Sequence, residues 1–374
     1  MLDLEAWGKS RSTNDLDAFS EIAIFGATPA AMDVLNYLAR KGRKPAFFSD
    51  NSAAKLGKDF QGYPIANAQE AAQLARRGGA VVIASAYQQD IAKQLIEQLD
   101  TPPSAVFPYI SDMFASHFGA QAIAPFRTRI ETVITRAADE ASHDYLAALV
   151  KFRWTMDPRD IPRNANVTGF YQYAGNHPQL PAIPHIVDCG AFTGDTAEAY
   201  LSRCNGAAHV TAIEPMPENF RQLVNLVRSK GWTAQVRPIH AAVGAARGNL
   251  SIRGSTQVAD ARACVTDRAG QDAITVPVIA LDDLFTDGQG APDLIKIDIE
   301  GFELEALMGA SKTILSASPQ LAVAAYHRPA HLWEIPEAIW ALDPQYKIFA
   351  GHHPSAHYEV EYYCARQSDM RSAA

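Results

Sequence analysis

Hydrophobic residues along the chain follow two periods, and their alternation predicts an α/β protein. Short apolar runs rich in Val, Ile, Ala and Phe are each followed by segments whose apolar side chains recur at helical spacing. The first pattern is typical of buried strands and the second of amphipathic helices. Early in the chain the expected strands lie at 21–25, 45–50 and 79–85, with a helix over 88–99 after the last of them. Residues 18 to about 100 therefore predict a small parallel α/β domain.

The same alternation resumes after residue 185 and predicts a second, larger α/β domain. Its expected strands lie at 186–188, 210–214, 236–239, 294–298 and 321–325. Asp188, Glu214 and Asp298 end three of these strands. Because ligands bind at the carboxyl ends of strands in an open parallel sheet, we expect the three carboxylates to line one crevice.

The segment between the two domains has a different character. Apolar residues from Ile130 to Leu149 recur at helical spacing, which predicts one long amphipathic helix. Five prolines then fall between residues 157 and 184, around Phe170, Tyr171 and Tyr173, which argues against regular structure and is typical of a functional lid. The chain is thus divided into a Rossmann-like domain at 18–120, a linking helix and lid at 121–184, and a second domain at 185–370.

Composition narrows the class of protein. The chain has 374 residues, of which 48% are hydrophobic and 20% charged, so two globular domains are expected. Its net charge of −8 argues against general binding to nucleic acid. The four cysteines are scattered without zinc-ligand or disulfide-framework spacing, and no signal peptide or membrane-spanning run is found. A soluble cytoplasmic protein without a membrane span is predicted.

The sharpest motif is DCGAFTGDT at 188–196, which follows an expected strand and opens a helix. Glycines there let the backbone approach a ligand, and the helix N-terminus offers N–H groups to an anion. The spacing D-x-G-x-x-x-G differs from the dinucleotide fingerprint G-x-G-x-x-G. Glu214, about 25 residues later, is placed to accept both hydroxyls of a ribose. The pair predicts a nucleoside cofactor without a pyrophosphate; alternatively, Asp188 caps a turn and Glu214 is a solvated strand end.

Three residues are candidates for the chemistry. Asp298 and Glu300 share strand parity, so both are expected to face the crevice, where a carboxylate pair orients a hydroxyl and accepts its proton. Alternatively, Glu300 stabilises the helix that begins near Phe302. His327 follows the next strand and is the second candidate for the base, the alternative being a hydrogen-bonded loop histidine. His352, His353 and His357 have no companion carboxylate at ligand spacing, so no metal site is predicted.

Taken together, these motifs resemble the FkbM family of S-adenosylmethionine-dependent methyltransferases. The resemblance covers about residues 160–366 and not the N-terminal domain. The motifs that carry it are DCGAFTGDT at 188–196, AIEP at 212–215, LDDLF at 281–285, KIDIEGFELEALMGA at 296–310 and YHRPAHLWEIP at 326–336. In addition, residues 346–366 resemble the closing antiparallel strands of the family.

The resemblance implies a seven-stranded, Rossmann-like class I methyltransferase domain that uses S-adenosylmethionine. The residues that it implies for cofactor binding are Asp188, Gly190, Ala191, Phe192, Thr193, Gly194 and Asp195 around the methionine moiety, Glu214 and Pro215 at the ribose, and Ala242 and Val243 near the adenine. The implied reaction is in-line methyl transfer to a hydroxyl of a sugar, glycan or natural product, with Asp298, Glu300 and His327 as catalytic residues. The acceptor, the dependence on metal and the oligomeric state are left open.

The N-terminal domain gives a weaker signal. Its first turn, Gly26–Ala31, matches the dinucleotide fingerprint only at its two ends, because Thr28 stands where the second glycine belongs. Asp50 is nevertheless a candidate for binding the hydroxyls of a ribose. The domain resembles small Rossmann-like modules that precede sugar-modifying enzymes. The alternatives for this domain are binding of a nucleotide or nucleotide sugar, and a structural or dimerising role. The alternatives for the whole chain are an NAD(P)-dependent or nucleotide-sugar enzyme and a non-catalytic binding protein.

Overall fold

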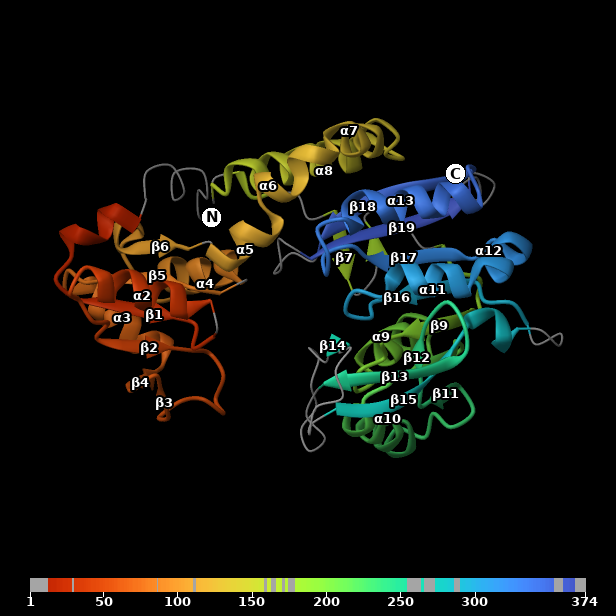
Figure 1. Cartoon of the computed structure of the whole chain (residues 1–374). Coiled ribbons are helices and arrows are strands. Elements are labelled where there is room, and N and C mark those ends of the chain that lie inside the picture. Colours follow the sequence, from red (N-terminus) through yellow and green to blue (C-terminus); the bar gives the residue numbers. More distant parts are fainter. Residues whose placement is uncertain are drawn as a thin grey trace. The chain divides into compact units, whose positions relative to one another are not determined.

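A computed structural model describes residues 13–28, 30–85, 87–109, 112–157, 160–162, 166–169, 172–173, 179–253, 264–265, 273–285, 290–352 and 359–366. Within them the chain forms two units. The first unit contains the described residues up to Arg127 together with those of 147–163, and the second contains the other described residues. Figure 1 shows the elements of both units.

The first unit is built on a six-stranded sheet of order β3-β4-β2-β1-β5-β6. All neighbours in it are parallel except the β3–β4 hairpin. Its strands are β1 (Ile22–Phe25), β2 (Phe47–Ser49), β3 (Asp59–Phe60), β4 (Tyr63–Ala66), β5 (Ala80–Ile83) and β6 (Val106–Pro108). Its helices are α2 (Ala31–Arg40), α3 (Ala68–Arg76), α4 (Gln88–Lys93), α5 (Asp112–Phe118) and α6 (Ala120–Ile123), and a π-helical turn over Gln94–Gln98 continues α4.

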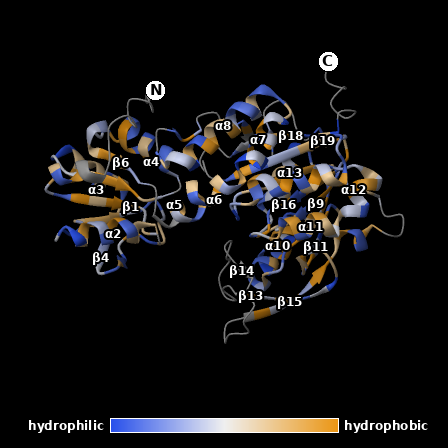
Figure 2. Ribbon diagram, turned by 45° about the horizontal axis from the view of Figure 1, so that its top comes forward, coloured by the Kyte–Doolittle hydropathy of each residue, from blue (hydrophilic) through white to orange (hydrophobic). Residues whose placement is uncertain are grey.

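The three predicted strands of this unit are confirmed, and β1 shows why they are continuous apolar runs. Ala23 and Phe25 pack into one hydrophobic cluster, while Ile22 and Ile24 pack into another, so both faces of the strand are buried. Figure 2 shows the same apolar character along the strands of this sheet. The edge strand β6 was not among the predicted strands; it ends in Pro108, and proline is tolerated at the end of an edge strand.

The prediction of one long helix over the residues from Ile130 to Leu149 is wrong. The segment forms two helices, α7 (Arg127–Thr135) and α8 (Glu140–Thr155). Between them, the amide of Ala138 donates to the carbonyl of Ile348, and the carboxylate of Asp139 accepts from the amide of Ser142 at the start of α8. These bonds end the first helix and cap the second, which helical periodicity alone does not reveal.

The proline-rich segment holds more regular structure than predicted. Strands β7 (Val167–Gly169) and β8 (Gln172–Tyr173) form an antiparallel pair within it. Much of the predicted lid, including Phe170 and Tyr171, lies outside the described residues, as do His353 and His357.

The second unit has a seven-stranded sheet of order β11-β10-β9-β16-β17-β19-β18. The first five strands are parallel, and β19 is antiparallel to both of its neighbours. This order confirms both the predicted parallel strands and the closing antiparallel pair. The strands are β9 (His185–Cys189), β10 (His209–Ile213), β11 (Val236–Ile239), β16 (Leu294–Ile297), β17 (Gln320–Ala324), β18 (Tyr346–His352) and β19 (Val360–Arg366).

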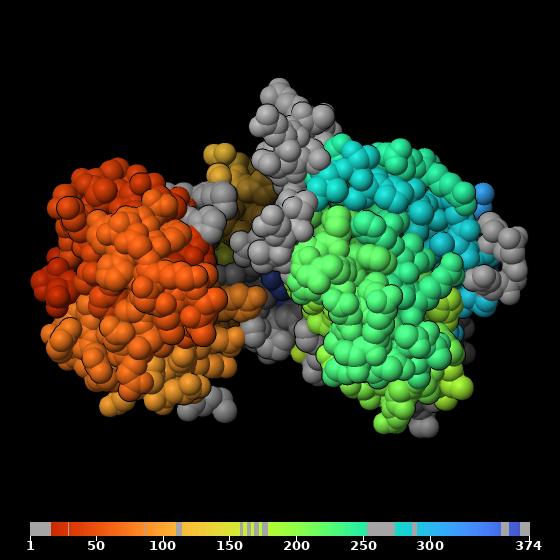
Figure 3. All heavy atoms as spheres, turned by 90° about the horizontal axis from the view of Figure 1, so that it is seen from below, coloured from red at the N-terminus to blue at the C-terminus, as the bar shows by residue number. Residues whose placement is uncertain are grey.

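Helices and a second, smaller sheet complete this unit. The helices are α9 (Asp195–Arg203), α10 (Pro217–Ser229), α11 (Glu303–Gly309), α12 (Ser311–Ala317) and α13 (His331–Leu342). The smaller sheet has the order β12-β15-β13-β14, formed by β12 (Ala242–Val243), β13 (Gly248–Arg253), β14 (Cys264–Val265) and β15 (Ala273–Ile279). In the space-filling view, the green segment around α10 lies at the surface of the unit (Figure 3).

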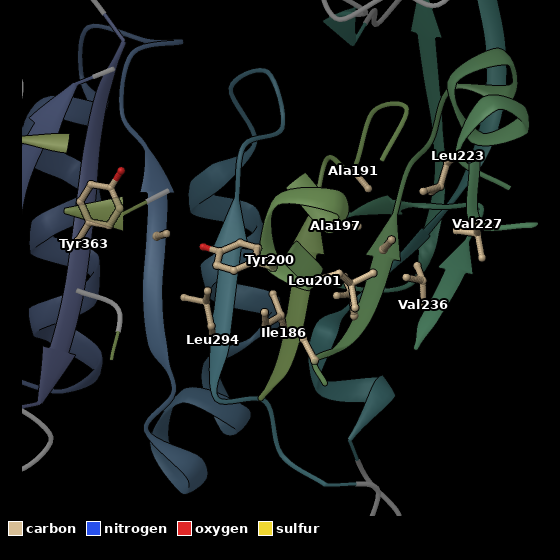
Figure 4. Packing of buried hydrophobic residues seen from close by; sticks show 14 of the residues in the cluster. Ile186, Ala191, Ala197, Tyr200, Leu201, Leu223, Val227, Val236, Leu294 and Tyr363 are labelled. Atoms are coloured by element: carbon tan, nitrogen blue, oxygen red, sulfur yellow. The ribbon is translucent and has the colours of Figure 1, made fainter. Parts of the chain in front are cut away.

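The core of the second unit lies between its main sheet and the helices that follow the first strands. Tyr200 and Leu201 of α9 pack with Ile186 of β9 and Leu294 of β16, all at most 2% exposed (Figure 4). This packing fixes α9 against the sheet, and therefore also the loop that joins β9 to α9. In the part of the chain that the structure describes, no helix is long and apolar enough to span a membrane.

Candidate cofactor and active site

A cavity of about 220 Å³ opens at the carboxyl ends of β9, β10 and β16. Its wall combines backbone from the loop after β9 with side chains that follow the neighbouring strands. The lining includes Gly190, Phe192, Asp195, Glu214, Pro215, Asn219, Ala242, Val243, Lys296, Asp298, Glu300 and Tyr326. The cavity therefore brings together most of the residues that the sequence motifs pointed to.

The loop after β9 turns sharply at Gly190. This residue has a φ of +83°, and a Cβ built on it would lie 1.9 Å from the carbonyl oxygen of Asp298. The amides of Gly190 and Ala191 both donate to the carbonyl of Ile213, and the amide of Phe192 donates to the carboxylate of Glu214. Only glycine fits at the first of these positions, which explains the D-x-G of the motif.

The loop then enters α9 through Gly194, whose φ of +100° is also in the left-handed region. Asp195 is the first residue of the helix, where a carboxylate is favoured by the helix dipole, and it lines the cavity. Thr193 is half-buried and Ala191 is buried. These two residues and Gly194 shape the loop without lining the cavity.

Asp188 does not line the crevice as its place at a strand end predicted. It lies within β9 and is 0% exposed, and its Oδ1 is 3.0 Å from the Nζ of Lys296, which is 2% exposed. Lys296 also donates to the carbonyl of Gly190 over 2.9 Å. Burial opposes the charge of Lys296, but the attraction of Asp188 and then of Asp298 outweighs it, so the pKa of this lysine is raised. The buried pair therefore supports the Gly190 loop from beneath.

Glu214 lies just after β10 and is 4% exposed. Its carboxylate accepts from the amides of Phe192 and Met216, both over 2.9 Å, and from the side-chain amide of Asn219 over 3.1 Å. Burial raises the pKa of Glu214 to about 7, although these three donors act in the opposite direction. The carboxylate is thus held in one orientation and can change its charge near neutral pH.

The opposite end of the cavity is apolar. Ala242 and Val243 form β12 and are 6% and 4% exposed, and Leu250 and Ile252 of β13 also line this end. Pro215 lies beside them, and its carbonyl is 3.0 Å from the Nε2 of His240. A small apolar slot of this kind suits the flat face of a heterocyclic base.

The polar end of the cavity is formed after β16. Asp298 follows this strand, its side chain is 20% exposed, and it accepts from the hydroxyl of Tyr326 over 3.2 Å. Glu300 does not continue the strand, as its predicted parity assumed, because its φ of +56° places it in a turn. It still lines the cavity, and its carboxylate oxygen lies 3.6 Å from the Nε2 of His327.

His327 lies behind these carboxylates instead of lining the cavity, and its side chain is 7% exposed. Its Nε2 is 3.5 Å from Asp298, and its Nδ1 is 2.8 Å from Glu303, a fully buried carboxylate at the start of α11. Burial opposes the charged form of His327, but Glu303, Asp298 and Glu300 outweigh it and raise its pKa to about 9. On the sequence alone, Glu300 is a candidate for the negative charge at the N-terminal end of the next helix. In the structure Glu303, the first residue of α11, has that place.

Sequence reasoning missed four residues of this site: Asn219, Lys296, Glu303 and Tyr326. One of them had a readable signal, because a lysine inside the buried apolar run Leu294–Ile297 requires a buried partner. Glu303 was hidden among three other acidic residues of the same motif. Asn219 and Tyr326 acquire their roles only through contacts with Glu214 and Asp298.

In the first unit, the turn after β1 is held by hydrogen bonds to residues that follow β2 and β5. Gly26 has a φ of +111°, and the hydroxyl of Thr28 donates to the carbonyl of Ala84. Asp50 accepts from the amide of Ala27 over 3.0 Å and from Lys55 over 2.9 Å. The carboxylate considered for ribose binding thus already fixes the turn, and nucleotide binding by this unit stays a prediction.

The strand order of the second unit, with the Gly190 loop and the strand-end acid Glu214, defines a class I methyltransferase fold. Residues 188–348 match the methyltransferase FkbM domain model. A hexuronic acid methyltransferase, AglP of Haloferax volcanii, is 30% identical over 127 residues, which are 33% of this chain and 51% of AglP. The chain thus spans about half the length of this curated relative.

A solved structure is similar over nearly the whole chain. The crystal structure of methyltransferase FkbM from Methylobacillus flagellatus has a TM-score of 0.65 and 21% sequence identity. The match covers 97% of this chain and 95% of that one, so the likeness in fold extends to both units. The seven-stranded methyltransferase fold expected from the sequence is confirmed.

Proposed function

We propose that the protein transfers a methyl group from S-adenosylmethionine to a hydroxyl of a sugar, glycan or natural-product acceptor. The observation that carries this proposal is the single cavity in which the Gly190 loop, Glu214 and Asp298 meet. Its lining combines apolar side chains, a strand-end carboxylate and a glycine loop, which are the surfaces that adenine, ribose and the methionine part of the cofactor would each need. No side chain in the described lining other than Lys296 is cationic, and Lys296 is paired with Asp188.

The charge of the cavity suits a sulfonium compound. Asp195, Glu214, Asp298 and Glu300 line it, whereas a pyrophosphate would face these carboxylates without a compensating cation. Glu214 would hold the ribose hydroxyls, Ala242 and Val243 would contact the adenine, and the loop from Gly190 to Asp195 would surround the amino acid part. S-adenosylmethionine supplies an electrophilic methyl group on a positively charged sulfur.

Asp298 is the residue best placed to act on the acceptor. It lines the cavity beside the Gly190 loop, and Tyr326 fixes its carboxylate. Held in this cavity, S-adenosylmethionine would supply a methyl group that the acceptor oxygen takes over, with the electron pair of the broken carbon–sulfur bond left on sulfur. Asp298 would orient the acceptor hydroxyl and accept the proton that this hydroxyl loses, and such positioning would provide much of the rate.

A sugar acceptor is supported by the similarity to AglP, whose name identifies a hexuronic acid as the compound that it methylates. The cavity adds a second argument, since its acidic polar end can accept hydrogen bonds from several hydroxyls at once. Hexuronic acids and their glycosides are accordingly the first acceptors to assay with radiolabelled S-adenosylmethionine.

The proposed cofactor is tested by isothermal titration of the full chain with S-adenosylmethionine, S-adenosylhomocysteine and NADPH. We expect saturable binding of the first two compounds at one site per chain and no heat from NADPH. Binding of NADPH without binding of either methionine compound would overturn the proposal and direct attention to the turn at Gly26.

Binding of S-adenosylhomocysteine should weaken as the pH falls from 8 to 6. The pKa of Glu214 is raised to about 7, so at pH 6 about nine in ten of these side chains are protonated and accept ribose hydroxyls poorly. We expect an affinity about tenfold lower at pH 6 than at pH 8, measured by titration calorimetry. The variant Glu214→Gln has no such charge to lose and should bind weakly with little change over this range; an equal pH dependence in both proteins would contradict the assignment.

A further inference from the structure

We infer that Glu303 is a positioning residue for methyl transfer, which acts through His327. It keeps His327 in the charged form, and the imidazolium in turn holds Asp298 and Glu300 at the cavity wall. Glu303 is the first residue of α11 and is 0% exposed; among the described residues it lies outside the cavity lining. The inference rests on the proposed function, because Asp298 and Glu300 are the side chains that would face the acceptor.

One carboxylate oxygen of Glu303 fixes the turn that carries Glu300. Its Oε1 accepts from the amides of Ile299 and Gly301 over 3.0 and 3.2 Å. These two residues flank Glu300, whose φ of +56° is a conformation that residues other than glycine keep only where their surroundings hold it. Glu303 therefore fixes the backbone from which the side chain of Glu300 reaches the cavity.

The same oxygen of Glu303 holds the ring of His327. It lies 2.8 Å from Nδ1, and because a carboxylate only accepts, Nδ1 carries the proton of this bond. On the other side of the ring, Nε2 lies 3.5 Å from an oxygen of Asp298 and 3.6 Å from an oxygen of Glu300. Burial opposes the charged form of His327, but the three carboxylates, Glu303 first, outweigh it and raise its pKa to about 9. The ring is thus charged at neutral pH.

A second buried histidine helps to keep Glu303 itself charged. His331 begins α13 and is 0% exposed, and its Nδ1 lies 3.1 Å from the Oε2 of Glu303. Burial opposes the charge of Glu303, but His327 and His331 outweigh it and lower the pKa of this carboxyl. Each oxygen of Glu303 therefore faces one imidazole, which fixes the orientation of the carboxylate.

The charged ring balances two carboxylates that would otherwise repel each other. Asp298 and Glu300 both line the cavity, and a cation that faces both from behind holds them in place by attraction. Tyr326, whose ring centroid is 4.1 Å from that of His327, adds a hydrogen bond to Asp298. Since both nitrogens of the charged ring carry protons, His327 has no lone pair for the acceptor proton and leaves this role to Asp298.

The pH dependence of kcat in Glu303→Gln tests the inference. The glutamine keeps the size of the side chain and an oxygen for the amides of the turn, but it lacks the charge that attracts His327. The pKa of His327 should then return toward its ordinary value of about 6.5, so the ring is neutral at pH 8 and charged again at pH 6. At saturating cofactor and acceptor, the ratio of variant to wild-type kcat should rise from about one tenth at pH 8 to more than about one half at pH 6.

Taking this ratio cancels the titration of the other groups, which both proteins share. Those around the ring are Asp298 and Glu300 of the turn after β16, Tyr326 and Arg328 of its own loop and, beyond Glu303, His331 of α13. Glu305→Gln, on the same helix, is the matched control and should keep a ratio near one at both pH values. His327→Gln has no charge to regain, so its ratio should stay low at pH 6. An equal loss in Glu303→Gln at both pH values would overturn the inference, because a purely structural role does not depend on the charge of His327.

The charge of His327 is also measured without activity, by NMR titration of the full chain labelled with carbon-13 at Cε1 of histidine. The signal missing from His327→Gln identifies the residue. We expect a midpoint near 9 in the wild type, and one at least about one pH unit lower in Glu303→Gln but not in Glu305→Gln. A wild-type midpoint near the ordinary value, or one that Glu303→Gln leaves unchanged, would overturn the inference. Failure of the proposed function is distinguishable, since it shows as a wild type that transfers no methyl group while the midpoints still differ.

Discussion

Replacement of Lys296 by Met is expected to lower the free energy of unfolding by about 3–5 kcal/mol. The lysine is 2% exposed and lies 3.0 Å from Asp188, which is 0% exposed, so the variant leaves a buried carboxylate without its cation. It also removes the hydrogen bond to the carbonyl of Gly190. Urea denaturation at pH 8 measures the loss, and weaker binding of S-adenosylhomocysteine should accompany it.

An exposed ion pair of the same unit provides the matched control. Lys230 lies 2.7 Å from Glu198, but the two side chains are 46% and 43% exposed. Lys230→Met should cost no more than about 1 kcal/mol, because water screens this pair. The double variant Asp188→Asn with Lys296→Met should regain much of the stability, since it carries no buried charge at this position. Equal decreases in the free energy of unfolding for Lys296→Met and Lys230→Met would show that the buried ion pair contributes no more to stability than the exposed one.

The second large effect is expected from Asp298→Asn, which should lower kcat for methyl transfer by about 10²–10⁴-fold. The asparagine keeps the shape of the side chain but neither accepts the proton of the acceptor nor attracts a positive species. Affinity for S-adenosylhomocysteine should change by no more than about threefold, since the carboxylate acts on the acceptor side. Single-turnover transfer of the radiolabelled methyl group to the best hexuronic acid or sugar acceptor gives the rate.

Glu305→Gln is the control for this variant. Glu305 lies in the same motif and on α11, but it does not line the cavity. Its replacement should leave kcat unchanged within about twofold. If Asp298→Asn transfers methyl groups as fast as the wild type, Asp298 is not the group that acts on the acceptor hydroxyl.

The five parallel strands of the main sheet in the second unit could be predicted because each is a short apolar run in the sequence. Runs such as Ile186–Val187 and Leu294–Ile295 are apolar on both faces, as strands buried in a parallel sheet usually are. The glycines of the β9–α9 loop were also readable, because positive φ angles and a close approach to Asp298 admit no other residue at Gly190. Local pattern failed where distant contacts intervene, as between α7 and α8, where Ala138 is held by Ile348 of β18.

The sequence by itself determined the α/β class, the glycine loop after β9 and the acids near the strand ends, because these depend on short-range rules of burial and backbone conformation. Only the tertiary structure decided which acids face the cavity. All three acids were expected at strand ends, yet Asp188 lies within β9 and is buried against Lys296, Glu214 is held by three N–H donors, and Asp298 lies beside Tyr326. The role of His327 likewise depends on Glu303, which reaches it only when α11 packs beside the loop after β17. The burial of these side chains and their bonding partners depend on residues far apart in the chain, so no local pattern predicts them.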